Sequence, residues 1–320
     1  MSTYAQVRGL KVITNDNPVT SNLEEGQLVV NTTSCCIQGV CFGASWSAGG
    51  AMGTARRNLA GAGTNTAALA FGGGTQFPLA CTESYNGSTW AAGGAMGTAR
   101  QRLAGAGTNT AALAFGGNGP SACTESYNGS AWSAGGALGT ARYFLAGAGT
   151  NTAALGFGGY GNNYTTLACT ELYNGTSWTA GGAMGTARYS LAGAGASNTA
   201  ALAFGGSEYN SGCFTCTESY NGTSWTAGGA MGTARSILAG AGASNTAALA
   251  FGGFGNFTVV ACTESYNGSS WSAGCAMGTA IRDLAGAGTN TAALGFGGYS
   301  NYTEVACTEL FSVGKLFKNF

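Results

Sequence analysis

Residues 103–142 read LAGAGTNTAALAFGGNGPSACTESYNGSAWSAGGALGTAR, and this stretch recurs with few changes through most of the 320-residue chain. Six tryptophans mark its copies and lie 42 to 47 residues apart: Trp46, Trp90, Trp132, Trp178, Trp225 and Trp271. A fixed period in this range is typical of proteins that stack copies of one supersecondary unit. The sequence therefore predicts a repeat architecture.

Each repeat contains four short segments with the composition of β-strands. Residues 103–107 precede a Thr-Asn-Thr break, residues 111–115 end at a glycine pair, residues 122–127 follow a loop, and Trp132 lies on the fourth segment. Asn128-Gly129 is a strong hairpin signal because both turn positions favour positive φ. Four strands in roughly 45 residues fit a propeller blade, and glycine and alanine in the first strand suit the crowded centre of a propeller.

The marker residues resemble those of the kelch repeat. That family has a glycine pair at a strand end, then a tyrosine, a tryptophan and an arginine, which here are Gly116, Gly117, Tyr127, Trp132 and Arg142. The resemblance extends from about residue 46 to about residue 311. It implies a β-propeller and says little about activity, because kelch propellers serve many functions.

Six leucines begin the innermost strands, and they predict an all-β, six-bladed kelch-like propeller over residues 41–320: Leu59, Leu103, Leu145, Leu191, Leu238 and Leu284. The strand around Trp46 precedes the first leucine, and the last repeat has no tryptophan. We therefore expect the Trp46 strand to complete the last blade. In the alternative, residues 314–320 form that strand and residues 27–46 begin a seventh blade.

Residues 1–40 lie outside the repeat and are interpreted as an N-terminal attachment segment. Within them, NPVTSNLEEGQLVVNTT at residues 17–33 resembles the leader before the repeats of tail-fibre-like bacteriophage proteins, especially aquatic ones. The run GTARxxLAGAGTNTAALAFGG is similar to repeats in the same proteins. The resemblance implies a virion protein that is assembled in the host cytoplasm and contacts other virion proteins through residues 1–40. Whether the chain forms homo-oligomers is left open. The alternative is an ordinary β-segment that caps the propeller.

Composition narrows the classes of function. Only 8% of the residues are charged, the net charge is zero, and the chain has no histidine. No basic patch supports nucleic-acid binding, and no apolar run reaches the roughly 18 residues of a membrane helix. Without histidine, the nucleophile systems and metal sites built on it are excluded. We therefore expect no enzyme activity, no cofactor, no metal and no membrane insertion.

Two charged positions recur with the repeat. One holds glutamate and the other holds arginine: Glu83, Glu125, Glu171, Glu218, Glu264 and Glu309, and Arg56, Arg100, Arg142, Arg188 and Arg235. An active site would hardly be repeated around a ring, and each charge would be costly to bury alone, so we expect structural ion pairs. In the sixth repeat the arginine is displaced by one position, to Arg282.

Six cysteines also share one repeat position: Cys81, Cys123, Cys169, Cys216, Cys262 and Cys307. Equivalent positions in different blades are too far apart for a disulfide, so we expect buried free thiols in a reducing compartment. Cys213 and Cys216 form a lone CxxC, which is a weak zinc signal. The roles of the irregular cysteines stay open: Cys35, Cys36, Cys41, Cys213 and Cys275.

The differences between repeats fall in two segments. The loop after each glycine pair varies, as do the two residues after each repeat arginine, whereas the TNT and YNG turns hardly change. In an up-and-down blade both variable segments emerge on one face. They carry aromatic residues that we expect to be exposed and that suit sugars and adaptable recognition: Phe77, Tyr143, Tyr160, Tyr164, Tyr189, Tyr209, Phe214, Phe254, Phe257, Tyr299 and Tyr302.

These observations predict a non-catalytic virion protein, such as a tail-fibre or receptor-binding protein, that binds a host-surface glycan or protein. Two alternatives remain: a capsid decoration or other structural virion protein, and a cellular kelch-like interaction module.

Overall fold

A computed structural model describes residues 4–7, 10–15, 27–31, 36–38, 44–209 and 212–313. The chain divides into two compact units, Met1–Ser45 with Ser312–Phe320, and Trp46–Phe311. In the first unit, four strands form one sheet in chain order, with β2 and β3 parallel and the other neighbours antiparallel: β1 (Tyr4–Val7), β2 (Leu10–Asn15), β3 (Gln27–Asn31) and β4 (Cys36–Gln38).

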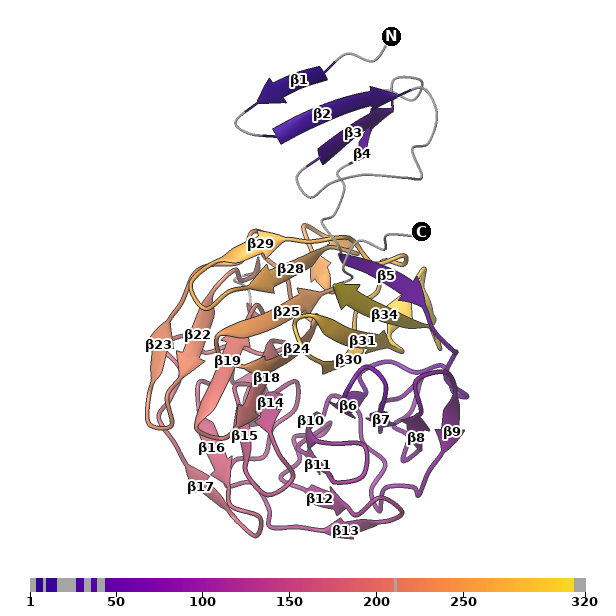
Figure 1. The fold of residues 1–320 in the computed structure, drawn as a ribbon. Helices are drawn as coiled ribbons and strands as arrows, with labels where there is room; N and C mark the ends of the chain where they lie inside the picture. The colour runs from indigo at the N-terminus through magenta and orange to yellow at the C-terminus, as the bar shows by residue number, and fades with distance from the viewer. Residues whose placement is uncertain are drawn as a thin grey trace. The chain divides into compact units, whose positions relative to one another are not determined.

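The second unit is a propeller of six four-stranded sheets, as the six-bladed prediction requires (Figure 1). Blade one contains β6 (Ala60–Gly63), β7 (Ala68–Phe71), β8 (Thr82–Tyr85) and β9 (Trp90–Ala92). Blade two contains β10 (Ala104–Gly107), β11 (Ala112–Phe115), β12 (Thr124–Tyr127) and β13 (Trp132–Ala134). Blade three contains β14 (Ala146–Gly149), β15 (Ala154–Phe157), β16 (Thr170–Tyr173) and β17 (Trp178–Ala180).

Blade four contains β18 (Ala192–Ser197), β19 (Ala200–Phe204), β22 (Thr217–Tyr220) and β23 (Trp225–Ala227). Blade five contains β24 (Ala239–Ser244), β25 (Ala247–Phe251), β28 (Thr263–Tyr266) and β29 (Trp271–Ala273). Blade six contains β30 (Ala285–Gly288), β31 (Ala292–Phe296), β34 (Thr308–Val313) and β5 (Ala44–Ala48).

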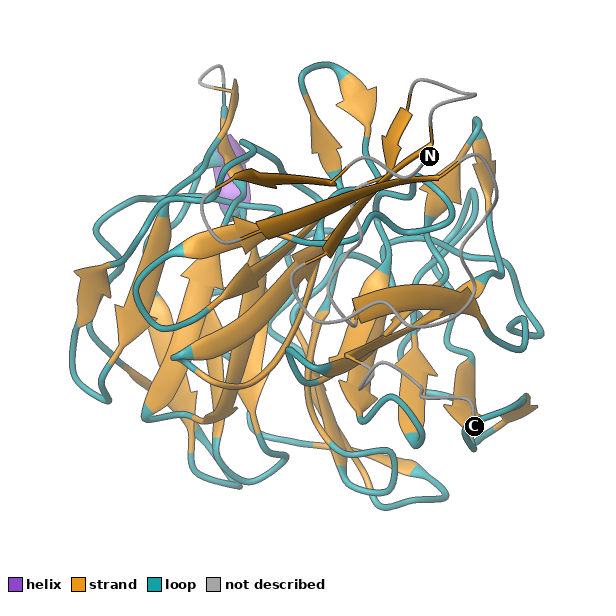
Figure 2. Cartoon of the chain, turned by 45° about the horizontal axis from the view of Figure 1, so that its top comes forward, coloured by secondary structure: helices purple, strands orange, loops and turns teal. Residues whose placement is uncertain are grey.

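Short hairpins or turns extend several loops between the second and third strands. They are β20 (Ser207–Glu208) with β21 (Gly212–Cys213), β26 (Phe254–Gly255) with β27 (Thr258–Val259), β32 (Tyr299–Ser300) with β33 (Thr303–Glu304), and the 3₁₀ turn η1 (Asn162–Tyr164). Figure 2 shows how strands and loops dominate the molecule. The described part of the chain contains no helix long and apolar enough to cross a membrane.

The ring is closed by an N-terminal strand, as the position of Trp46 predicts. β5 pairs with β34 and supplies the outer strand of blade six. The Gly49 N–H donates to the Thr308 carbonyl at 2.8 Å, and the Met52 N–H donates to the Ala306 carbonyl at 2.8 Å. The seven-bladed alternative is therefore wrong, because residues 27–31 belong to the first unit's sheet and residues 44–48 to blade six. Residues 314–320, which that alternative used, lie outside the described residues.

The inner strands explain the glycine and alanine content of the repeat. Figure 1 shows β6, β10, β14, β18, β24 and β30 gathered at the centre of the propeller. A Cβ atom added to Gly105 would lie 2.6 Å from Phe71 Cζ and 2.8 Å from the Gly61 carbonyl oxygen, both in the preceding blade. Because both distances are below contact distance, the centre of the propeller has no room for a larger residue here.

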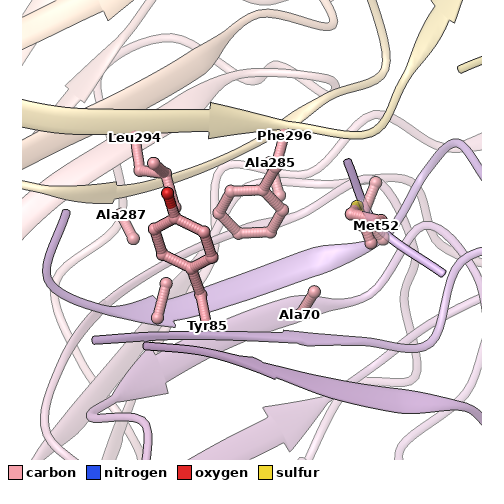
Figure 3. Close-up of a cluster of buried hydrophobic side chains, with 9 residues drawn as sticks. Met52, Ala70, Tyr85, Ala285, Ala287, Leu294 and Phe296 are labelled. Carbon is pink, nitrogen blue, oxygen red and sulfur yellow. The ribbon is translucent and has the colours of Figure 1, made fainter. Parts of the chain in front are cut away.

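Neighbouring blades are joined by one repeated contact at their outer strands. The Trp132 indole N–H donates to the Thr82 hydroxyl of the preceding blade at 2.9 Å, and its ring lies 5.0 Å from that of Phe71. The same bond closes the ring between blade one and blade six, where Trp90 donates to Thr308 at 3.0 Å. Figure 3 shows this junction, with Tyr85 of blade one facing Leu294 and Phe296 of blade six.

The repeated charges form buried ion pairs in five blades, which confirms the structural interpretation. The Arg–Glu distances are 2.8 Å for Arg100–Glu125, 2.9 Å for Arg142–Glu171, 3.0 Å for Arg188–Glu218 and 2.9 Å for Arg235–Glu264, and Arg56 pairs with Glu83. Burial lowers the pKa of the arginines at 100, 142, 188 and 235, and the facing glutamates oppose that effect.

Blade six departs from this pattern. Ile281, only 1% exposed, occupies the position of the arginine, and Arg282 lies one residue further along, outside the interior. Glu309 is still buried and accepts hydrogen bonds from the Gly278 N–H at 2.7 Å and the Thr279 N–H at 3.0 Å. Backbone donors therefore satisfy a carboxylate that has an arginine partner in the other blades.

The repeated cysteines are less buried than predicted. They are half-buried, and Cys123 is exposed, because each lies just before the third strand and at its edge. In blade three, Arg142 Nη1 lies 2.9 Å from Cys169 Sγ. The six repeated cysteines are free, as predicted, and so is Cys213; Cys275, whose role the sequence left open, is disulfide-bonded.

Candidate functional site

The two variable segments of each blade hydrogen-bond to each other, which confirms that they share a face. The backbone of Tyr143 exchanges hydrogen bonds of 3.0 and 2.7 Å with that of Tyr160, and Arg282 exchanges bonds of 3.1 and 2.8 Å with Tyr299. Equivalent bonds join Ser236 to Phe254 at 2.9 Å. We call the surface formed by these connections and by the loops after the glycine pairs the variable face.

The predicted aromatic residues differ in how they lie on the variable face. Five are exposed by 62–98%: Phe77, Tyr164, Tyr209, Phe257 and Tyr302. Another five are half-buried: Tyr143, Tyr189, Phe214, Phe254 and Tyr299. Tyr160 is only 5% exposed, so its predicted exposure is wrong. Its ring is covered by Tyr189 at 4.6 Å and Tyr143 at 5.7 Å, which come from two neighbouring connections.

Three of the exposed aromatics sit at loop tips in an unfavourable backbone conformation. Asn163-Tyr164, Asn256-Phe257 and Asn301-Tyr302 all have φ between +47° and +64°. In such two-residue turns the second position favours glycine, and a left-handed side chain costs about 1–2 kcal/mol. We call Tyr164, Phe257 and Tyr302 the tip aromatics. Bulky side chains in left-handed turns are features that cluster at functional sites.

A second set of residues surrounds the propeller axis at the variable face. Each is the second residue after the repeat arginine position, and we call the set the axial ring: Asn58, Arg102, Phe144, Ser190, Ile237 and Asp283. Each backbone N–H donates to the carbonyl of the ring residue in the preceding blade, at 2.8–3.0 Å, and Asn58 closes the circle by donating to Asp283. All six have φ between +47° and +60°.

The axial ring lines a small depression. Its volume is about 80 Å³, and the leucines that begin the inner strands complete its lining. Burial raises the pKa of the Asp283 carboxyl, and the guanidinium groups of Arg282, Arg57 and Arg102 oppose that effect. Acidic and basic side chains are therefore close together at this end of the axis.

The opposite face is formed by the repeated turns, and we call it the constant face. The Thr108 hydroxyl accepts the Ala111 N–H at 3.1 Å, and Asn128 Oδ1 accepts the Ser130 and Ala131 N–H groups at 3.0 and 2.9 Å. These bonds account for the Asn-Xaa-Ser/Thr triplets as turn chemistry. At this face the axis opens into a channel of about 300 Å³ lined by glycine, alanine and threonine of the inner strands.

Metal-binding chemistry has little support on either face. Within residues 44–209 and 212–313, no three histidine, cysteine, aspartate or glutamate side chains are placed to hold a metal ion. Cys213 and Cys216, the CxxC pair, are both free; Cys213 Sγ lies 3.4 Å from the Ser236 hydroxyl, and Cys216 Sγ lies 3.0 Å from Arg188 Nη1. Burial raises the pKa of the Cys216 thiol despite the nearby arginine.

The sequence identified the variable connections, but only Tyr143 and Tyr189 were selected from them, and the aromatic Phe144 was passed over. The axial ring lies one residue further along, and its members share no residue type, so no single chemical class marked them. A usable signal was present: these positions differ in all six repeats, whereas the leucine that follows never changes. No protein-family model and no curated protein matches this chain.

Proposed function

We propose that this protein is a non-catalytic component of a bacteriophage virion that binds a host-surface glycan or protein through the variable face. One observation carries the binding role: the repeat is nearly constant everywhere except where the two variable segments meet. The tip aromatics strengthen it, because Phe257 and Tyr302 are 98% and 92% exposed in turns that favour glycine.

Exposed aromatic side chains are suited to this role. They supply large, rigid contact areas for sugar rings and for protein pockets, and a few such anchors usually dominate the binding energy. A role limited to folding would not explain them, because loop tips contribute little to a core. The acidic residues offer little support for catalysis, since six of the twelve are the repeated glutamates that the interior uses.

The virion assignment rests on the sequence resemblances. The leader at residues 17–33 and the GTARxxLAGAGTNTAALAFGG run both resemble tail-fibre-like phage proteins, and the marker residues resemble kelch repeats. Residues 1–40 would then attach the propeller to other virion proteins. If the loops contact virion subunits instead of host cells, the protein is a capsid decoration or fibre-building protein.

Adsorption to cells tests the proposal. We expect fluorescently labelled full-length protein to adsorb to the host within a panel of bacterial cells. Replacing Tyr164, Phe257 and Tyr302 with alanine should reduce adsorption at least tenfold, with circular dichroism unchanged. The matched control is Thr108→Ala with Thr110→Ala on the constant face, which should adsorb like the wild type. Equal adsorption by the triple variant, or adsorption to no cell, would favour the structural virion role.

A further inference from the structure

The six residues of the axial ring have backbone φ values at which glycine is favoured over residues with a side chain. Glycine is the least costly residue at φ near +50°, asparagine and aspartate are tolerated, and a β-branched residue is a clear outlier. Yet the ring contains Arg102, Phe144 and Ile237 at φ values of +60°, +53° and +47°. Because the ring's hydrogen bonds join backbone atoms only, the fold itself does not require these side chains.

The ring has two chemically different arcs. Asp283, Asn58 and Arg102 are consecutive in the circle of hydrogen bonds and make one arc polar. The opposite arc contains Phe144, Ser190 and Ile237 and is mostly apolar. Just outside the ring the division continues, with Arg57 and Arg282 beside the polar arc and the rings of Tyr143 and Tyr189 beside Phe144, at 5.4 and 6.1 Å.

The charges around the polar arc do not cancel. Arg57 pairs with Glu304 at 3.5 Å, and Arg282 lies 3.8 Å from Asp283. Arg102 makes no ion pair or side-chain hydrogen bond with any residue of the described propeller; its guanidinium lies over the Phe144 ring, 4.8 Å from the ring centre. Three arginines and two carboxylates thus leave one positive charge. Among the described residues, Arg102 is the arginine with no carboxylate at ion-pair distance, although its charge still acts on Asp283.

We propose that the axial depression is a subsite for the carboxylate of an acidic sugar, with Arg102 as its anion-binding residue. This inference rests on the proposed function and specifies its ligand class. A guanidinium matches a carboxylate with two parallel N–H donors, and such charge-assisted hydrogen bonds are stronger and more specific in geometry than neutral ones. The depression of about 80 Å³ is about half the roughly 150 Å³ of a cavity that holds benzene, so it fits a substituent and not a whole sugar.

The surrounding groups fit the remainder of such a ligand. Asp283 and Asn58 offer an acceptor and an amide for hydroxyl groups, beside the carboxylate site. Phe144 and the neighbouring tyrosines offer apolar surface for the C–H face of the sugar ring. A neutral sugar would use the same hydroxyl and stacking contacts but would leave the Arg102 charge without a partner.

Ligand-observed NMR tests the inference directly. Full-length protein is titrated with glucuronate, galacturonate and N-acetylneuraminate, and with glucose and galactose as neutral counterparts. We expect at least one acid to bind, at least tenfold more tightly than the neutral sugars. Arg102→Gln should weaken that binding at least tenfold, Arg102→Lys less, and the constant-face control Thr108→Ala not at all.

A second variant should change the affinity for the acid in the opposite direction, and this test remains valid even if Arg102→Gln fails to fold. Asp283→Asn removes a negative charge beside the site and should tighten binding of the acid. Equal binding of acidic and neutral sugars, binding of none of the acids, or an unchanged affinity in Arg102→Gln and Asp283→Asn would overturn the inference. Cell adsorption that depends on the tip aromatics, without acid binding, would leave the proposed function standing.

Discussion

The two faces of the propeller are held together in different ways. On the constant face, side chains close the turns: Asn128 and Thr108 accept backbone N–H groups of their own loops. On the variable face, backbone groups hold each other through the axial ring and through pairs such as Tyr143 with Tyr160. Where side chains hold the turns, substituting them would break the turns. Where backbone hydrogen bonds hold the loops, the side chains can be substituted without loss of those bonds. The contrast explains why near-identical repeats end in six different sets of loops.

The largest expected effect concerns the strand that closes the ring, on which both faces depend. Deleting residues 1–48 removes β5 together with Trp46, whose ring lies 5.0 Å from Phe251 and 5.2 Å from Phe311. Loss of a fully buried tryptophan costs about 3–5 kcal/mol, and the half-buried Trp46 should contribute part of that; β34 would also become the unpaired edge strand of blade six. We expect the deletion to abolish cooperative thermal unfolding, measured by circular dichroism.

The matched control is a deletion that ends five residues earlier in the chain. Deleting residues 1–43 keeps β5 and should preserve a cooperative transition. Both proteins are measured in reductant, so that the Cys275 disulfide does not distinguish them. Identical melting curves for the two deletions would show that the ring does not need β5.

The second prediction compares one repeated side chain in two blades. Glu218→Gln leaves Arg188, which is 0% exposed, without its ion-pair partner and should cost about 3–5 kcal/mol of unfolding free energy. Glu309→Gln leaves no arginine unpaired, since Ile281 occupies that position, and should cost at most about 2 kcal/mol through weaker bonds to backbone N–H groups. Urea denaturation measures both. Equal losses would mean that the arginine charge contributes little to the cost.

The smallest effect concerns a side chain of the variable face and has the opposite sign. Tyr302→Gly should stabilise the fold by about 0.5–1 kcal/mol, because glycine tolerates the φ of +64° at this turn. The same change should weaken adsorption to cells. Tyr302→Ala keeps the strain and serves as the control for stability. A glycine variant less stable than the alanine variant would contradict the account of strain at the tips.

The sequence predicted the repeated parts of this fold well. The strands, the closure by the Trp46 segment and the buried Arg–Glu pairs all depend on residues that recur at a fixed period, so each copy supports the same interpretation. The variable face was located by the same comparison, because its residues are the ones that differ from repeat to repeat.

What the sequence missed depends on contacts between blades. Tyr160 is buried because Tyr143 and Tyr189 arrive from two other connections, and the period gives no measure of that distance. Cys123 precedes β12 by one residue, so its exposure depends on a strand boundary that composition does not mark. Arg102 was visible as a variable residue, but its lack of a carboxylate partner is a property of the folded ring.

The circle of backbone hydrogen bonds at the axis also bears on how such a protein diversifies. Because each blade contributes one N–H and one carbonyl to the circle, any blade satisfies its neighbours regardless of the side chain that it brings. Recombination between near-identical gene segments would therefore reorder six side chains around one axis without disturbing the bonds beneath them. New combinations of side chains at the axis would then arise by exchanging whole blades.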